Sequence, residues 1–308
     1  MSIAFSELNH RYLYGFLRTK ATHTNYVRLY SQFFADWTDH PTRPQIKQWH
    51  DQHAEHPAHA NKALGYLRAM YNWAMNEGLW ELANPAVGIK RHQTFSRERV
   101  MDLREVKLIL GTLDFLNEKY HAWFLCRLLV PCRVTELCAM RRDAVDPYGK
   151  WTKTKTKNGR PHVIHVPMQA LALLQALPIE GDYFFMGHYG QPLSPCAVRK
   201  IWSRYRTDLK LSDLWLLDFR RTIATYLYRV LKVDDLTAKA VLNHYDSRPV
   251  AVYTRLDYDY LATIIQGYAD WIMAHKQGGQ YETIKTLAHA AVDPLSLRPA
   301  ELPRIGLG

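Results

Sequence analysis

The first 92 residues repeat apolar side chains at helical spacing, and this pattern constrains the fold of the chain more than any other. Between Thr24 and Trp37 the aromatic and aliphatic residues recur every three or four positions, which places them on one stripe of a helix. We interpret the stripe as core packing. Its members are Tyr26, Leu29, Tyr30, Phe33, Phe34 and Trp37. The helices expected here are Phe5–Arg18, Thr24–Trp37, Arg43–His53 and His59–Asn76.

A basic stretch with Pro and Gly, from Asn84 to Arg99, separates this segment from the rest and reads as a linker. The expected division is a helical domain at residues 1–92, a linker at 93–99, a second domain at 100–275 and a tail at 276–308.

The second domain is predicted to be mainly helical with a small antiparallel sheet. Asn158-Gly159 lies between two extended runs, and Asn-Gly in that position is a strong hairpin signal. The expected strands are Lys150–Thr156 and Pro161–Val166. The expected helices are Leu103–Leu116, Ala122–Val130, Pro195–Leu209, Arg220–Leu231, Leu236–Leu242 and Tyr260–His275.

The charge balance points to an anionic partner. Among 308 residues, 40 Lys and Arg oppose 29 Asp and Glu, which gives a net charge of +11. In a folded chain such an excess favours nucleic acid as the partner. No apolar run approaches the ~18 residues of a membrane span, and the N-terminus lacks the regions of a signal peptide. We therefore expect a cytoplasmic protein with no membrane partner.

The cysteines do not form a metal-binding pattern, because no CxxC pair is present. We expect ordinary buried thiols. They are Cys126, Cys132, Cys138 and Cys196.

Two segments offer cations for phosphate binding. Arg133 opens a predicted helix in the motif Arg-Val-Thr-Glu-Leu, where its guanidinium fork and the helix N-terminus both favour an anion. Lys153, Lys155 and Lys157 alternate along a predicted strand and so share one face, which must be solvated or meet an anion. Each segment taken alone also fits a purely structural role. The first would be an exposed Arg–Glu pair on a helix, and the second an edge strand protected by lysines.

Two further segments lie later in the chain. Arg220 and Arg221 begin a predicted helix, with Asp218 read as its cap. Asn243 is predicted to end another helix in the left-handed conformation, so that His244 would project from a turn. Tyr253 follows nine residues after His244. Each histidine or tyrosine alone would usually be structural.

Together the four segments, in the order Arg, Lys, Arg, His, Tyr, resemble the tyrosine recombinase family of the phage integrase type. The motif likeness runs from Val100 to about Leu256, and the helical first domain is similar in layout to the family's core-binding (SAM-like) domain. The resemblance implies a two-domain clamp around DNA. It also implies a site-specific recombinase that integrates or excises a mobile element through a 3′-phosphotyrosyl intermediate. We expect no arm-binding domain ahead of the clamp.

The resemblance assigns a role to each catalytic candidate. Tyr253 would attack the scissile phosphate, and Arg133 and Arg220 would bind its non-bridging oxygens. Lys157 would protonate the leaving 5′-oxygen, with Lys155 as the alternative, and His244 would bond the phosphate or assist proton transfer. This chemistry needs neither cofactor nor metal.

Three supporting expectations concern neighbouring residues. Glu136 would support Arg133. Tyr258 and Tyr260 are rival nucleophiles, but the spacing from His244 selects Tyr253. A basic outer face on the helix after Pro195 would meet the duplex. Its cations are Arg199, Lys200, Arg204 and Arg206.

The chain also departs from the family pattern. Leu217 stands where the family usually has a histidine, three residues before Arg220, and a leucine moves no proton. Pro131 stands where a glycine is common. The alternatives are therefore a catalytically impaired DNA-binding protein and an enzyme like type IB topoisomerases.

The partners implied are double-stranded DNA attachment sites and three further copies of the chain in a homotetramer, with an accessory DNA-bending protein as a further candidate. Through DNA the protein would associate with the nucleoid.

Overall fold

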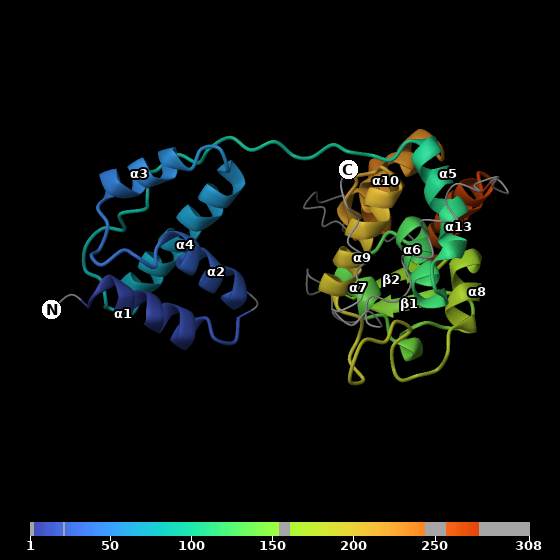
Figure 1. Ribbon diagram of the computed structural model, residues 1–308, viewed down its shortest axis with the longest axis horizontal. Coiled ribbons are helices and arrows are strands. Elements are labelled where there is room, and N and C mark those ends of the chain that lie inside the picture. The colour runs from blue at the N-terminus through green and yellow to red at the C-terminus, as the bar shows by residue number, and fades with distance from the viewer. Residues whose placement is uncertain (1–2, 21, 154–160, 244–256, 277–308) are drawn as a thin grey trace, which may run out of the picture. The chain divides into compact units, whose positions relative to one another are not determined.

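The computed structural model describes residues 3–20, 22–153, 161–243 and 257–276. The chain divides into two compact units, Met1–Arg97 and Glu98–Gly308. In the described residues both units are mainly helical, and a two-stranded antiparallel sheet lies in the second (Figure 1), so the predicted fold class is confirmed. No helix among those residues combines the length and apolar character needed to span a bilayer.

The N-terminal unit consists of helices around an aromatic core, and each of its four expected helices is present with altered ends. The first is α-helical only to His10 and continues as a π-helical turn (Arg11–Phe16). The last begins at Pro57, since a proline at the first helical position lacks an N–H that the helix does not need. The α-helices are α1 (Phe5–His10), α2 (His23–Phe33), α3 (Arg43–Gln52) and α4 (Pro57–Asn76).

The aromatic stripe of α2 packs against this core as the periodicity predicts, but only Phe34 of the stripe is fully buried. The Phe34 ring contacts those of Trp37, Trp49 and Tyr66, with centroids 5.0, 4.9 and 5.9 Å away. The helix ends at Phe33 rather than at Trp37, and Trp37 reaches the core from the turn that follows.

Hydrogen bonds hold the chain near the end of the N-terminal unit against α3 and α4. The amide of Asn61 donates to the His92 carbonyl (2.8 Å) and accepts from the His92 backbone N–H (2.9 Å). The His92 Nε2–H donates to the His50 carbonyl (2.8 Å), and the two imidazole rings stack with centroids 3.8 Å apart. Residues up to His92 therefore belong to the folded unit.

The C-terminal unit is built around α6 (Glu118–Leu129), nine of whose twelve residues are buried. A helix that is apolar on most sides lies inside a domain, and α6 contacts several neighbours (Figure 1). Those neighbours are α7 (Val134–Cys138), α8 (Met168–Ala176), α10 (Leu216–Arg229) and α13 (Tyr258–Met273). The other α-helices among the described residues of this unit are α5 (Leu103–Thr112), α9 (Pro195–Asp208) and α11 (Asp235–Val241).

Several helix boundaries differ from expectation because polar side chains cap the helices earlier. The Asn117 side chain accepts the Tyr120 N–H (3.0 Å), so α6 begins four residues before Ala122. Helix α10 begins four residues before Arg220, since Asp218 accepts the backbone N–H of Trp215. The chain after Thr112 tightens into a 3₁₀ turn, which shortens α5.

The sheet pairs β1 (Lys150–Lys153) with β2 (His162–His165) in antiparallel register, with Lys150 opposite His165 and Lys153 opposite His162. The expected turn at Asn158-Gly159 lies outside the described residues.

Three of the four cysteines, Cys126, Cys132 and Cys138, are buried as expected. The expectation is wrong for Cys196, which is exposed because it lies in the first turn of α9 on the solvent side.

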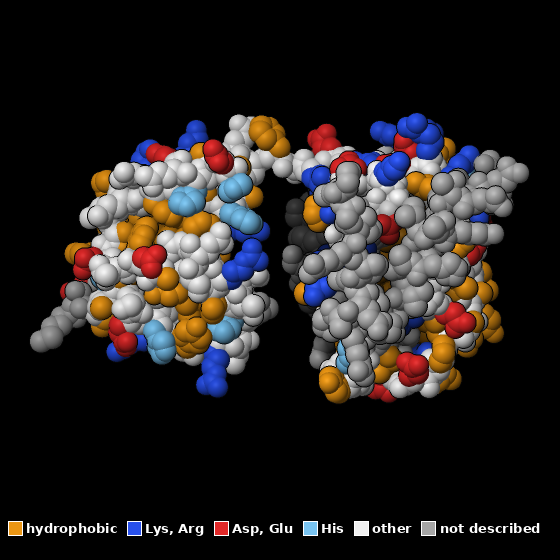
Figure 2. All heavy atoms as spheres, in the orientation of Figure 1, with side chains coloured by type: hydrophobic (Ala, Val, Ile, Leu, Met, Phe, Trp, Pro, Cys, Tyr) orange, Lys and Arg blue, Asp and Glu red, His pale blue; other side chains and the backbone are white. Residues whose placement is uncertain are grey.

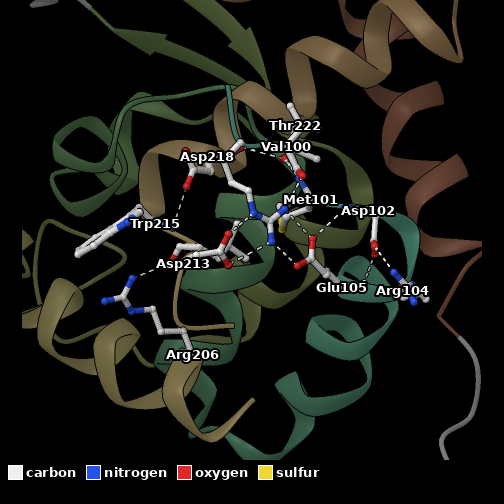
Figure 3. A network of polar contacts seen from close by, with 12 residues as sticks. Val100, Met101, Asp102, Arg104, Glu105, Arg206, Asp213, Trp215, Asp218 and Thr222 are labelled. Atoms are coloured by element: carbon white, nitrogen blue, oxygen red, sulfur yellow. Dashed lines mark hydrogen bonds and ion pairs between the residues drawn. The ribbon is translucent and has the colours of Figure 1, made fainter. Parts of the chain in front are cut away.

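Hydrogen bonds and ion pairs hold the start of the C-terminal unit against α5 and α10. The Arg99 guanidinium donates to Glu105 (2.9 Å) and Asp213 (2.7 Å). The Met101 backbone N–H donates to the Thr222 hydroxyl (2.9 Å), and Met101, Glu105, Asp213 and Thr222 lie together in Figure 3. The hydroxyl of Tyr226 donates to the Met101 carbonyl (3.1 Å).

Candidate active site

Arg133 precedes α7 and is held there by the third residue of that helix, Glu136. One Glu136 oxygen accepts from the Arg133 Nη1 (2.8 Å), and the other accepts from the Arg133 backbone N–H (3.0 Å). A carboxylate at this helical position commonly captures the N–H of the residue before the helix. The Arg-Val-Thr-Glu motif thus fixes both the main chain and the side chain of Arg133.

Lys153 at the end of β1 reaches the same carboxylate. Its Nζ lies 3.0 Å from Glu136 Oε2, and the two side chains are 6% and 10% exposed. Burial raises the pKa of Glu136, but Lys153 and Arg133 together outweigh burial and hold that pKa at about 2. Of the three alternating lysines, Lys153 therefore meets an anion inside the protein.

Arg220 lies in the second turn of α10, rather than at the helix start as expected. Its guanidinium donates to the Pro131 carbonyl (2.7 Å) and to the Leu242 carbonyl, so it joins the turn before Arg133 to the end of α11. Burial, and next the charge of Arg133, lower the pKa of Arg220 to about 10, which leaves it charged at neutral pH.

Arg133 and Arg220 line one pocket of about 570 Å³, and no carboxylate is among the described residues that line it. Such a concentration of guanidinium groups favours an anionic occupant. The pocket is formed by Arg127, Arg133, Val134, Thr135, Arg199, Trp202, Ser203, Arg206, Trp215, Leu216, Leu217 and Arg220.

Arg127 is fully buried behind this pocket and acts on the backbone. Its guanidinium donates to the carbonyls of Leu216 and Cys132, each at 2.6 Å. It thereby joins the start of α10 to the turn before Arg133.

Leu217 is 57% exposed in the pocket wall. It lies three residues before Arg220 within α10, and residues at that spacing share a helix face. Asp218 lies away from the pocket, where it is fully buried and also pairs with Arg221 (2.7 Å). It caps α10 from the third helical position, and not from the position before the helix.

Four predicted site residues, Lys155, Lys157, His244 and Tyr253, lie outside the described residues. Asn243, at the end of α11, has the expected left-handed conformation with φ of 49°.

The two rival tyrosines lie in the first turn of α13, and neither lines the pocket. Burial, and next Asp146 and Asp259, raise the pKa of Tyr258 to about 12, which disfavours loss of the proton that a nucleophile must give up. Tyr260 is 49% exposed.

The cations of α9 divide between the pocket and solvent. Arg199 and Arg206 line the pocket, and Arg206 also lies 3.9 Å from the centroid of the Trp215 ring. Lys200 and Arg204 are exposed, while the stripe of Val198, Trp202 and Tyr205 is buried.

Two residues beside the arginines, Lys153 and His162, were not among the predicted catalytic residues, although the strand pattern names Lys153 as one of three lysines that must be solvated or meet an anion. His162 Nε2 lies 3.3 Å from the Ala240 carbonyl, whereas its buried Nδ1 has no hydrogen-bond partner in the part of the chain that the structure describes. Burial, and next the charge of Lys153, lower the pKa of His162 to about 4, so its ring is neutral at pH 7. The alternation along β1 places Lys153 on the same face as buried Trp151. This shared face was the sequence signal that could have indicated a buried Lys153.

The profile of the phage integrase family matches residues 99–259, just over half of the chain. The chain belongs to the phage integrase family. As a tyrosine recombinase it is an enzyme that breaks and rejoins DNA strands.

Curated relatives agree with this assignment. The chain is 27% identical over 222 residues to tyrosine recombinase XerC of Alcanivorax borkumensis, across 67% of this chain and 71% of that protein. It is 26% identical over 216 residues to tyrosine recombinase XerC of Pseudomonas fluorescens, across 66% and 71% of the two chains.

Solved integrase structures share the fold at low sequence identity. A lambda integrase dimer bound to a COC′ core site matches with a TM-score of 0.65 and 17% identity, across 79% of this chain and 96% of that chain. A lambda integrase tetramer bound to a Holliday junction matches with a TM-score of 0.64 and 18% identity, across 83% and 80%. The Tn1549 transposon integrase with circular intermediate DNA matches with a TM-score of 0.60 and 13% identity, across 88% and 99%.

Proposed function

We propose that this recombinase acts at DNA attachment sites, where it integrates or excises a mobile element through a 3′-phosphotyrosyl intermediate at Tyr253. The observation that carries the proposal is the pocket that Arg133 and Arg220 line together, with no carboxylate from the described residues in its wall. Two guanidinium groups on one phosphate stabilise the charge that develops as it reacts.

In the proposed reaction the Tyr253 hydroxyl oxygen forms a bond to the scissile phosphorus while the bond to the 5′-oxygen breaks. Arg133 and Arg220 bind the non-bridging oxygens, Lys157 gives a proton to the leaving 5′-oxygen, and His244 hydrogen-bonds the phosphate. The tyrosine proton passes to solvent, because Leu217 replaces the side chain that would accept it in the family pattern. Rejoining reverses these steps with a different 5′-hydroxyl.

A second basic surface supports DNA binding by the N-terminal unit, which we propose to be the core-binding domain. A cleft of about 720 Å³ lies between α2, α4 and the chain at residues 91–94, and its described lining includes Arg28, Lys62 and Arg91 and no carboxylate. Figure 2 shows histidine and basic side chains gathered along one edge of this unit. Such a surface suits contacts to DNA phosphates.

The working assembly that we propose is a homotetramer on two DNA sites. Lambda integrase, whose fold this chain shares, is described as a dimer on a core site and as a tetramer on a Holliday junction. The net charge of +11 fits an assembly held on DNA.

The test is covalent trapping on nicked duplexes. A pool with randomised arms is incubated with the protein, and DNA that stays attached in SDS is recovered and sequenced. We expect an adduct with the wild type and none with Tyr253→Phe, and a loss of at least about a hundredfold in rate with Arg220→Ala.

The outcomes separate three functions. Specific binding with no adduct from any duplex would mean a DNA-binding protein that has lost strand cleavage. Relaxation of supercoiled DNA without a preferred sequence would mean a topoisomerase-like activity. An adduct that persists in Tyr253→Phe would exclude this tyrosine as the nucleophile.

A further inference from the structure

We propose that Lys153 is a positioning residue for DNA cleavage, which acts through Glu136 to keep Arg133 available for the scissile phosphate. This inference rests on the proposed function. It concerns a lysine other than the proposed general acid, Lys157.

The first step of the argument is the use of the Glu136 oxygens. One accepts from the Arg133 side chain, and the other accepts from the Arg133 backbone and from Lys153. With both oxygens engaged inside the protein, the carboxylate has a fixed orientation and the Arg133 guanidinium is held by one edge. Its remaining guanidinium N–H groups have no hydrogen bond to another described residue and can bind an anion.

The second step concerns charge. A buried carboxylate paired with Arg133 alone would make a neutral couple and would cancel most of the attraction between Arg133 and a phosphate. Lys153 supplies a second cation to that carboxylate. The group formed by Arg133, Glu136, Lys153 and Arg220 contains three cations and one carboxylate, hence a net charge of +2.

A phosphodiester carries one negative charge, and a phosphorus with five oxygens attached in the transition state carries two. Each cation held near the phosphate therefore stabilises the transition state more than the ground state, which is the condition for catalysis. Without Lys153 the group of Arg133, Glu136 and Arg220 carries +1, and the preference for the transition state falls.

The third step is the placement of Lys153. It is the last described residue of β1 and pairs across the strands with His162, whose ring reaches the end of α11. These paired residues thus contact helix α7, whose Glu136 holds Arg133, on one side and the helix that precedes His244 on the other. A side chain here is placed to align those segments.

The experiment compares Lys153→Met with the wild type on a sequence recovered from the nicked pool, with and without a methylphosphonate at the scissile position. A methylphosphonate lacks one negative charge, so a defect in charge matching becomes smaller on it. We expect adduct formation by Lys153→Met to be about 10- to 100-fold slower on phosphate. On methylphosphonate that ratio should shrink at least about tenfold, and Lys153→Arg should restore most of the rate.

The matched control is Lys239→Met, which removes a half-buried lysine from a pair with exposed Asp235 (2.8 Å) in α11 of the same unit. Its rate should equal that of the wild type. A Lys153→Met variant that reacts at the wild-type rate, or is equally slow on both substrates, overturns the inference. A wild type that forms no adduct overturns the proposed function instead, and with it the catalytic meaning of Lys153.

A second measurement needs no DNA. It distinguishes a change at Glu136 from misfolding of the variant. In protein with ¹³C-labelled glutamate carboxyls, the Glu136 signal is assigned by its loss in Glu136→Gln. The pKa read from this signal should rise in Lys153→Met, since burial then opposes the charge with one cation fewer. An unchanged pKa in a folded variant would contradict the role of Lys153.

Discussion

Asp218 lies fully buried in the first turn of α10 and accepts the backbone N–H of Trp215 at 2.8 Å. The same carboxylate pairs with Arg221 one turn later (2.7 Å). Because these contacts set the residue at which α10 begins, they also set where Arg220 enters the pocket.

Asp218→Ala should therefore lower the free energy of unfolding by about 3 kcal/mol, since it removes a cap and leaves Arg221 without this partner. Urea unfolding measures the change. Asp143→Ala, which breaks an exposed pair with Arg141, should cost less than about 1 kcal/mol. Equal losses in the two variants would mean that the Asp218 contacts do not stabilise α10.

His162 should make stability fall in mild acid. Its folded pKa of about 4 lies below the ~6.5 of an unfolded histidine, so the unfolded chain binds more protons between these values. Stability present above pH 6.5 is lost as the pH falls, by about 2 kcal/mol from pH 7 to pH 5. The measurement is urea unfolding at both pH values, compared with His162→Gln. The variant should lack this part of the loss, whereas identical pH profiles would show that His162 is already charged in the folded protein.

Leu217→His should raise the rate of adduct formation at least about tenfold, because an imidazole three residues before Arg220 faces the same pocket and can accept the tyrosine proton. Since Leu217 is largely exposed, the variant should unfold within about 0.5 kcal/mol of the wild type. SDS-resistant adduct measures the rate. Leu217→Gln is the control, as it offers hydrogen bonds without proton exchange. A gain shared by both variants would point to polarity alone.

The cleft of the N-terminal unit should contribute to DNA affinity. Lys62→Ala combined with Arg91→Ala should weaken binding about tenfold and reduce the salt dependence of the affinity by about two counterions. Fluorescence anisotropy at several salt concentrations measures both. Arg11→Ala combined with Lys47→Ala removes the same charge from exposed pairs outside the cleft. If this control weakens binding as much, net charge accounts for the effect.

Helical periodicity predicted the existence of most helices but not their ends. The starts of α6 and α10 depend on the side chains of Asn117 and Asp218, which cap helices from different positions. No helix was predicted at Met168–Ala176, because its alanines and leucines form no clear stripe.

The sequence pointed to both arginines of the candidate site and to Glu136 as the support of Arg133, but not to the contacts that hold Arg220. Arg220 bonds the carbonyls of Pro131 and Leu242, and such contacts between distant segments leave no periodic trace. Strand alternation showed that the lysines share a face without showing which face is buried. Only the folded chain brings Glu136 to Lys153.

The contacts of Met101 decide where a fragment of this protein can begin. A chain cut to start at Asp102 would keep α5 whole, yet it would leave the hydroxyls of Thr222 and Tyr226 without the Met101 backbone. It would also remove Arg99 from Glu105 and Asp213. The last residues of the basic stretch are thus part of the recombinase fold rather than a tether, and an expression boundary placed inside them would loosen the helix that carries Arg220.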